Sequence, residues 1–158
     1  MSIVKRLKQL KPREWNSRTP ASLDELKTLE QTLGVRFPED FRELLLYSDG
    51  GSIYGHATPL ILFSVEELDV YAREAEYEKD LPGMITIGTD SGDAIFFFDP
   101  NNRLNHGTFA VFFVELSALS YVRSAFVGKN ISEVITRVLN DGNLGDLLPY
   151  NRPTGTSF

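Results

Sequence analysis

The stretch GVRFPEDFRELLLYSDGG, residues Gly34–Gly51, contains the signals that decide the fold. Gly34 follows the apolar run of a preceding helix, where a left-handed glycine typically ends the helix. Pro38 suits the first turn of a second helix, because its φ is fixed near the helical value and its missing N–H is not needed there. That helix carries an apolar stripe at three- and four-residue spacing, formed by Phe41, Leu44 and Leu45. Asp49-Gly50-Gly51 then ends it, so the stretch predicts a corner between two helices and an exit into a sheet.

Further helices begin at recognisable caps. In Ser22-Leu-Asp-Glu25 and again in Ser64-Val-Glu-Glu67, the serine can accept from a backbone N–H while the glutamate reaches back, an arrangement called a capping box. Apolar residues at helical spacing follow each box, which predicts helices over residues 23–33 and 65–75. Asn130 caps a last helix, which has the cleanest amphipathic pattern in the chain. Another helix is predicted from about residue 117 by the spacing of Leu116, Leu119, Val122 and Phe126.

The middle of the chain predicts strands. Short runs that are apolar or alternate in polarity cover residues 53–55, 59–63, 85–87, 94–98 and 109–114. Short loops join the later runs and favour antiparallel pairing, so the fold class is α+β, a mainly antiparallel central sheet flanked by N- and C-terminal helices. Two of the strands are apolar at nearly every position, so either helices cover both sheet faces or one face is a binding surface. We favour the first alternative, because exposed phenylalanines at this density would form an unusually large apolar patch.

The two ends of the chain lie outside this pattern. Residues 1–21 form a basic amphipathic helix followed by a linker, residues 22–142 hold the domain, and residues 143–158 form a tail. A basic helix of this kind can bind an anionic surface or a partner, but we expect it to fold back on the domain. The start of the tail is expected to be held by Leu144, Leu147 and Leu148, and the rest to be loose.

Two motifs give the chain a resemblance to a known family. The first is the proline-initiated helix with an aromatic residue after it, which closes on Asp49-Gly50-Gly51. The second is GTDSGDAIFFFD, Gly88–Asp99, a glycine- and aspartate-rich turn leading into a strand that ends in Asp. In order and separation they resemble the SUKH superfamily, which includes yeast cell-wall synthesis regulators of the SMI/KNR kind and many bacterial toxin-immunity proteins. The resemblance covers about residues 23–142 and implies the same α+β architecture.

The composition and charge exclude several classes of protein. The 158 residues include no cysteine, which excludes disulfides, thiol chemistry and cysteine-ligated metals. Residues 1–13 hold five basic residues and no acidic one, whereas the remainder holds 11 basic and 22 acidic residues, a net charge of −11. An acidic body argues against nucleic-acid binding and would attract a basic partner, although the charge also serves solubility. No apolar segment approaches the ~20 residues of a membrane span and no secretory leader is visible, so we expect a cytoplasmic protein without membrane contact.

The sequence shows no catalytic or cofactor-binding motif. It lacks a nucleophile elbow, a phosphate-binding loop and a dinucleotide glycine fingerprint. His56 and His106 lie fifty residues apart, which argues against a zinc site. We therefore expect no cofactor and no metal. Asp90, Asp93 and Asp99 flank two neighbouring strand ends, where they would either converge as a metal or acid–base site or cap turns; we favour turn capping.

The resemblance implies a non-enzymatic protein-binding module, an immunity protein that neutralises a bacterial toxin, often a nuclease, by direct binding. An acidic inhibitor suits a nuclease, because an active site that holds phosphate must be basic. Two alternatives stay open, a regulatory scaffold like the yeast proteins that binds a cellular partner, and a hydrolase with a carboxylate site. Neither the toxin nor the oligomeric state follows from the sequence. The candidate partner-binding residues, chosen by position, are Asp49, Tyr54, Glu66, Glu67, Asp69, Glu74, Asp90, Asp93 and Asp99.

Overall fold

A computed structural model describes residues 1–149 of the chain. The helices in this range are α1 (Ile3–Gln9), α2 (Leu23–Leu33), α3 (Glu39–Tyr47), α4 (Val65–Ala72), α5 (Ala75–Asp80) and α6 (Ile131–Asn140). The strands are β1 (Trp15–Ser17), β2 (Gly51–Ile53), β3 (Leu60–Leu62), β4 (Ile85–Thr89), β5 (Ala94–Asp99), β6 (Ala110–Glu115) and β7 (Ala125–Gly128). Short 3-10 helices follow β6 and α6, at η1 (Leu116–Ala118) and η2 (Leu144–Leu147).

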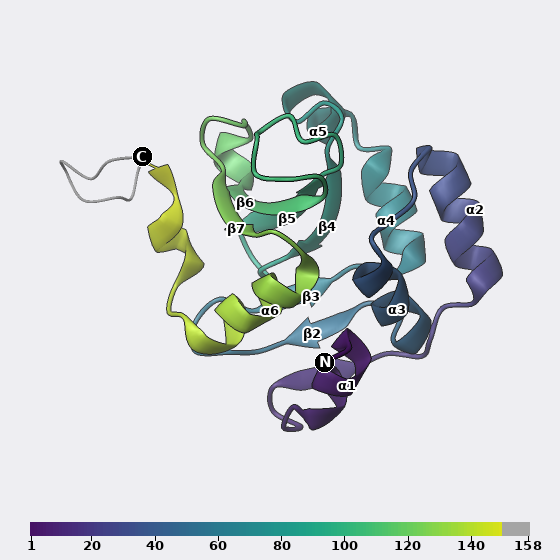
Figure 1. Cartoon of the computed structure of the whole chain (residues 1–158). Helices are drawn as coiled ribbons and strands as arrows, with labels where there is room; N and C mark the ends of the chain where they lie inside the picture. Colours follow the sequence, from purple (N-terminus) through teal and green to yellow (C-terminus); the bar gives the residue numbers. More distant parts are fainter. Residues whose placement is uncertain (150–158) are drawn as a thin grey trace.

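The strands of the described chain form one seven-stranded antiparallel sheet, and their spatial order is their sequence order, β1 to β7. The longest pairing in the sheet joins β5 to β6, and it runs in register from Ala94 opposite Glu115 to Asp99 opposite Ala110. Two residue pairs join β3 to β4, and Figure 1 shows β2 and β3 below the larger group formed by β4 to β7. The predicted α+β class with an antiparallel sheet and helices at both ends is confirmed.

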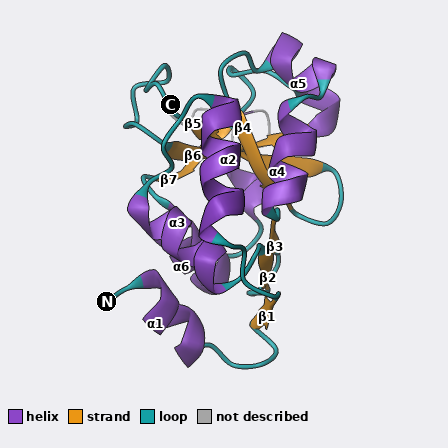
Figure 2. Cartoon of the chain, turned by 90° about the vertical axis from the view of Figure 1, so that its right-hand side faces the viewer, coloured by secondary structure: helices purple, strands orange, loops and turns teal. Residues whose placement is uncertain are grey.

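The helices α2, α3, α4 and α6 lie on one side of the sheet (Figure 2). The basic helix α1 folds back on the domain, as expected, because Ile3 and Leu7 are buried in the main core. Arg6 on this helix also donates a 2.8 Å hydrogen bond to the Ser132 carbonyl at the start of α6. The basic segment is therefore anchored by both apolar burial and a polar contact.

The corner between α2 and α3 forms as the sequence predicts. Gly34 ends α2 with a φ of 68°, and Pro38 occupies the N-cap of α3, one position before the predicted first turn. After α3, the buried hydroxyl of Ser48 donates to the Gly50 carbonyl. A Cβ at Gly50, where φ is 84°, would lie 2.5 Å from the Leu62 carbonyl oxygen. Glycine is required here because the backbone of β3 passes so close to the exit of the helix.

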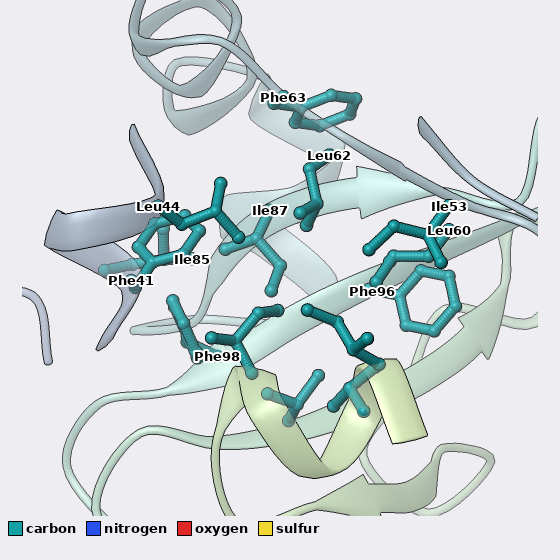
Figure 3. Close-up of a cluster of buried hydrophobic side chains, with 14 of the residues drawn as sticks. Phe41, Leu44, Ile53, Leu60, Leu62, Phe63, Ile85, Ile87, Phe96 and Phe98 are labelled. Carbon is teal, nitrogen blue, oxygen red and sulfur yellow. The ribbon is translucent and has the colours of Figure 1, made fainter. Parts of the chain in front are cut away.

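The main core lies between the sheet and these helices. Alternate residues of β5 point into it, so Phe96 and Phe98 are fully buried together with Phe41 and Leu44 of α3. The rings of Phe41 and Phe98 pack edge to face with centroids 5.0 Å apart, a geometry that contributes about 0.5–1.5 kcal/mol beyond burial. Figure 3 shows Phe41 and Leu44 beside Ile87 of β4. The corner helix is thus fixed directly on the central strands.

The opposite face of the sheet is covered mainly by loops. Ile95, Phe97 and Phe112 point to this side and pack with Leu81 and Tyr121. Both faces are therefore covered, but the favoured prediction that helices cover both is only partly correct, because α5 contributes here and loops supply the rest of the cover. This cover leaves a groove of about 580 Å³, lined by Leu104, His106, Phe112, Tyr121, Val122, Ser124, Phe126 and Pro149.

Two helix predictions differ from the structure. The segment 65–80 forms two helices, because Glu74 is extended with ψ at 118° and Tyr71 stacks between Phe63 and Tyr77. The helix predicted from residue 117 is wrong. Only η1 forms there, and the following residues make the edge strand β7, which pairs with β6. The apolar spacing misled because one of its members, Val122, is 85% exposed in a loop.

The chain ends also add detail to the prediction. The expected linker includes strand β1, in which Trp15 pairs with Ile53 of β2. A segment with one apolar residue in three gives no strand pattern, so tertiary pairing decides its conformation. Leu144 and Leu148 are buried, as expected for the start of the tail. The part of the tail expected to be loose lies mostly outside the described residues.

Candidate functional site

Asp49 and Tyr54 follow the corner helix and have different environments. The Asp49 Oδ1 accepts a 2.7 Å hydrogen bond from the Val65 N–H, which satisfies one of the free amides at the start of α4. Burial raises the pKa of Asp49, and the bond from Val65 opposes that rise. The Tyr54 backbone donates to the Glu14 carbonyl at 2.9 Å, and the residue is 45% exposed. Asp49 therefore positions α4, whereas Tyr54 is accessible to a partner.

Glu67 is held by contacts within the protein. It completes a capping box with Ser64. The Glu67 Oε1 accepts from the Ser64 N–H at 3.0 Å, and the Ser64 Oγ accepts from the Glu67 N–H at 3.1 Å. The same Oε1 lies 2.7 Å from Nη1 of Arg18. Burial alone would raise the pKa of Glu67, but the hydrogen bonds from Ser64 and Arg18 outweigh it and lower the pKa. This carboxylate ties the β1–α2 connection to α4 and is less available to a partner.

The other acidic candidates on α4 and at the start of α5 are also of two kinds, one bound within the protein and the others unbound in the described part of the chain. Asp69 pairs with Arg73 four residues on, at 3.1 Å, and that arginine donates to both carboxylate oxygens. Glu66 is exposed and forms no side-chain hydrogen bond or ion pair with another described residue. Glu74 is exposed at the N-cap of α5 without a side-chain capping bond. Glu66 and Glu74 are thus the carboxylates of this group that are free for a partner.

Asp90, Asp93 and Asp99 do not converge, so the alternative of a shared carboxylate site is wrong. Asp93 directly precedes β5 and Asp99 ends it, about 20 Å apart at the usual rise of a strand. The Asp90 Oδ1 accepts from the backbone N–H groups of Gly92 and Ala94 at 3.0 and 3.1 Å. Asp90 is therefore a turn cap. Asp99 caps the turn at the far end of β5 in a similar way, so two of the three aspartates are turn caps.

Asp99 is the fully buried member of this group. Its two oxygens accept from the N–H groups of Arg103 at 3.0 Å and Leu104 at 2.9 Å, which closes the β5–β6 turn. Asp93 is exposed, and its backbone carbonyl accepts from the Leu116 N–H at 2.7 Å. Asp99 cannot contact a partner, whereas Asp93 is an accessible carboxylate in the turn between β4 and β5.

Glu66 and three other carboxylates line a groove of about 390 Å³ between α2 and α4. Figures 1 and 2 show these two helices side by side. The floor of the groove is apolar, formed by Leu29 and Val65, which are 3% and 8% exposed. Four of its eight lining residues are acidic and none is basic. We call this feature the α2–α4 groove; its lining residues are Asp24, Glu25, Thr28, Leu29, Thr32, Val65, Glu66 and Asp69.

Sequence reasoning found half of this acidic rim. Glu66 and Asp69 were candidates, whereas Asp24 and Glu25 were seen only as the first turn of a helix. The available signal was that both helices start with a capping box and that each first turn contains two acidic residues, one of which is the glutamate of the box. Only the fold shows that those two starts belong to one groove.

Other kinds of site find little support in residues 1–149. No group of three or more histidine, aspartate or glutamate side chains in that range could hold a metal ion. Among the described helices, none combines the length and apolarity needed to cross a membrane. Among the described residues, the polar groups that are candidates for binding are therefore the capping carboxylates and the carboxylates of the α2–α4 groove.

The architecture can be compared with known proteins. The family model described as SMI1 / KNR4 family (SUKH-1) matches residues 20–137, most of the chain, including the corner and the Gly88–Asp99 turn and strand. The chain belongs to this family. SUKH proteins are typically immunity proteins, and the family is generally non-catalytic, with immunity or regulatory roles. A comparison with curated proteins finds no match.

Proposed function

We propose that this SUKH protein is an immunity protein that binds a basic toxin domain, for example a nuclease, and blocks it sterically in the cytoplasm. Family membership supports a protein-binding role. The single observation that favours a basic partner is the α2–α4 groove, whose rim holds four carboxylates and no cation. Beyond residue 13 the chain carries a net charge of −11, which would speed the approach of a positively charged partner.

Inhibition of this kind needs no reaction. A nuclease must present positive charge where it holds phosphate, and an acidic protein competes for that same surface. The accessible candidates on this side are Glu66 and Glu74, whereas Asp49 and Glu67 hold the helices that carry them. These contacts hold the start of α4 in place within the protein, and a surface that is already ordered loses less entropy when a partner binds.

Regulatory binding within the same family is the second candidate. It is favoured by the match itself, because the matching model is that of the SMI1 / KNR4 family and members of the SUKH family include regulatory proteins. The two functions differ in the partner, which is toxic in one case and a normal cell component in the other. The hydrolase alternative is not proposed again, because Asp93 and Asp99 lie at opposite ends of β5.

The test combines capture with protection. The purified protein serves as bait in a lysate of its own cells at low and then moderate salt, and each salt-released basic protein is expressed in a host with or without this protein. An immunity protein should restore the growth of cells that the partner arrests, and an unrelated acidic protein of similar charge should not. A captured partner that never arrests growth would replace the immunity proposal with the regulatory one.

A further inference from the structure

We infer that the α2–α4 groove receives one or two lysine or arginine side chains from a basic segment of the partner. This inference rests on the proposed function and names the contact through which it would act. The groove has the two features that such side chains need, an apolar floor for the aliphatic stem and acceptors at the rim for the charged head. The floor is made by Leu29 and Val65, and the rim includes Asp24 and Glu66.

Two of the four rim carboxylates, Asp24 and Glu66, are not used by the protein itself, whereas Glu25 belongs to the α2 capping box and Asp69 pairs with Arg73. Neither Asp24 nor Glu66 has a side-chain hydrogen bond or ion pair to another residue in the described part of the chain. Both residues are exposed. A cation that enters the groove therefore does not have to displace an existing partner from either carboxylate.

The nearby basic residues of the protein are bound by its own carboxylates or lie on another side of α2. Arg18 is bound by Glu67 at 2.7 Å, and Arg42 is buried against Glu30 at 3.2 Å. Lys27 on α2 lines a different groove, on the side of the helix that faces residues 31–36. Arg73 pairs with the rim residue Asp69 at 3.1 Å, so the negative charge left for a cation from another molecule is mainly that of Asp24 and Glu66.

The size of the groove limits what can enter. About 390 Å³ is near the lower end of the 300–1,000 Å³ typical of small-ligand pockets. That space fits side chains of an extended segment, not a folded element. The groove near Phe112 on the other sheet face is larger but lacks acidic lining residues, so it offers a cation no comparable partner.

The first experiment uses a penta-arginine peptide as the probe, and a penta-citrulline peptide, of nearly the same shape but uncharged, as its control. Binding to the whole chain is followed by calorimetry and by the backbone amide shifts of the ¹⁵N-labelled protein. We expect penta-arginine to shift the amides of Thr28, Thr32 and Glu66, and penta-citrulline to leave them unchanged. Absence of penta-arginine binding at low salt, or shifts spread evenly over every acidic surface, would overturn the inference.

Matched variants separate the groove from general acidity. The groove pair Asp24→Asn/Glu66→Gln should weaken penta-arginine binding about five- to tenfold, because two exposed charge contacts are lost. The control pair Glu78→Gln/Asp146→Asn changes the net charge equally at exposed positions outside the groove and should weaken binding less than about twofold. An equal loss in both pairs would mean that only overall charge matters, and would refute the groove as the site.

A second readout, the protection of growth, separates this inference about the groove from the proposed immunity function. If a toxic partner is found, the groove pair should protect growth less well than the control pair. Full protection by the groove pair would reject the groove and leave the immunity proposal standing. A third result would be that the whole chain dimerises in a concentration-dependent way that the groove pair abolishes. That result would identify the occupant of the groove as the basic N-terminal segment of a second copy, and it would overturn the inference that a partner's side chains bind there.

Discussion

Replacing Arg42 by methionine should destabilise the protein more than any surface substitution, because it breaks a buried ion pair. The Nε of Arg42 on α3 lies 3.2 Å from both carboxylate oxygens of Glu30 on α2, with the two side chains 8% and 9% exposed. The Glu30 Oε2 also accepts from the Phe37 N–H at 2.8 Å. Without Arg42, the carboxylate of Glu30 stays buried with no cation beside it.

The expected magnitude follows from that burial. Removing one member of a buried pair costs about 3–5 kcal/mol, because the remaining charge is desolvated and uncompensated. For a chain of this length, each kcal/mol lowers the Tm by about 2–4 °C, so Arg42→Met should lower it by roughly 6–20 °C. The double variant Glu30→Gln/Arg42→Met removes both charges and keeps an oxygen for the Phe37 N–H, so it should cost only about 1 kcal/mol.

Urea unfolding provides the measurement, followed by circular dichroism and by the fluorescence of Trp15, the single tryptophan. The three variants Glu30→Gln, Arg42→Met and the double form a cycle with the wild type. Each single substitution should be more damaging than the pair. A double variant as unstable as the sum of the two singles, or an Arg42→Met cost below about 1 kcal/mol, would show that the two groups do not depend on one another.

Two further predictions follow from close contacts and from titration. Gly55→Ala should destabilise the protein by about 1–3 kcal/mol or more, because the added Cβ would lie 1.7 Å from the Val138 carbonyl oxygen. Thermal unfolding should show a lower midpoint for this variant. The control Gly142→Ala, whose added Cβ meets nothing within 4 Å, should unfold like the wild type. The raised pKa of Asp49 means that the folded protein binds its proton more tightly than the unfolded chain does, so the unfolding free energy should fall as pH rises from 3.8 through the folded-state pKa. Asp49→Asn keeps an acceptor for Val65 and should remove that part of the slope in urea midpoints measured against pH; an unchanged slope would assign it to other carboxyl groups.

Local signals predicted the helix starts and the corner correctly. Ser22, Ser64 and Asn130 each accept from the backbone N–H three residues on, and Gly34 takes the left-handed conformation. These signals are reliable because cap and partner are neighbours in sequence. The favoured role of Asp90 and Asp99 as turn caps depends on similarly local hydrogen bonds, whereas the separation of Asp93 and Asp99 by β5 had not been used to exclude their convergence.

Non-local pairing decided the features that the sequence missed. Strand β7 forms because β6 needs a partner along its open edge, and Phe126 takes its place opposite Phe112 in that pairing. Its apolar residues fit a helical spacing equally well, so periodicity could not distinguish the two states. The α2–α4 groove was missed for the same reason, because nothing in a single helix indicates which other helix lies beside it.

The position of the groove at two helix starts explains how its charge is maintained in the free protein. Asp24 and Glu66 lie in the first turns of α2 and α4, where a carboxylate near the positive end of a helix dipole gains about 0.3–1 kcal/mol. That gain offsets the mutual repulsion of the rim carboxylates, which solvent and salt also weaken. Asp69, the rim carboxylate that lies farther along α4, is compensated by Arg73 instead. The local requirement for acidic residues at a helix start therefore permits a concentrated negative rim, and a cation that enters it adds an attraction that the free protein lacks.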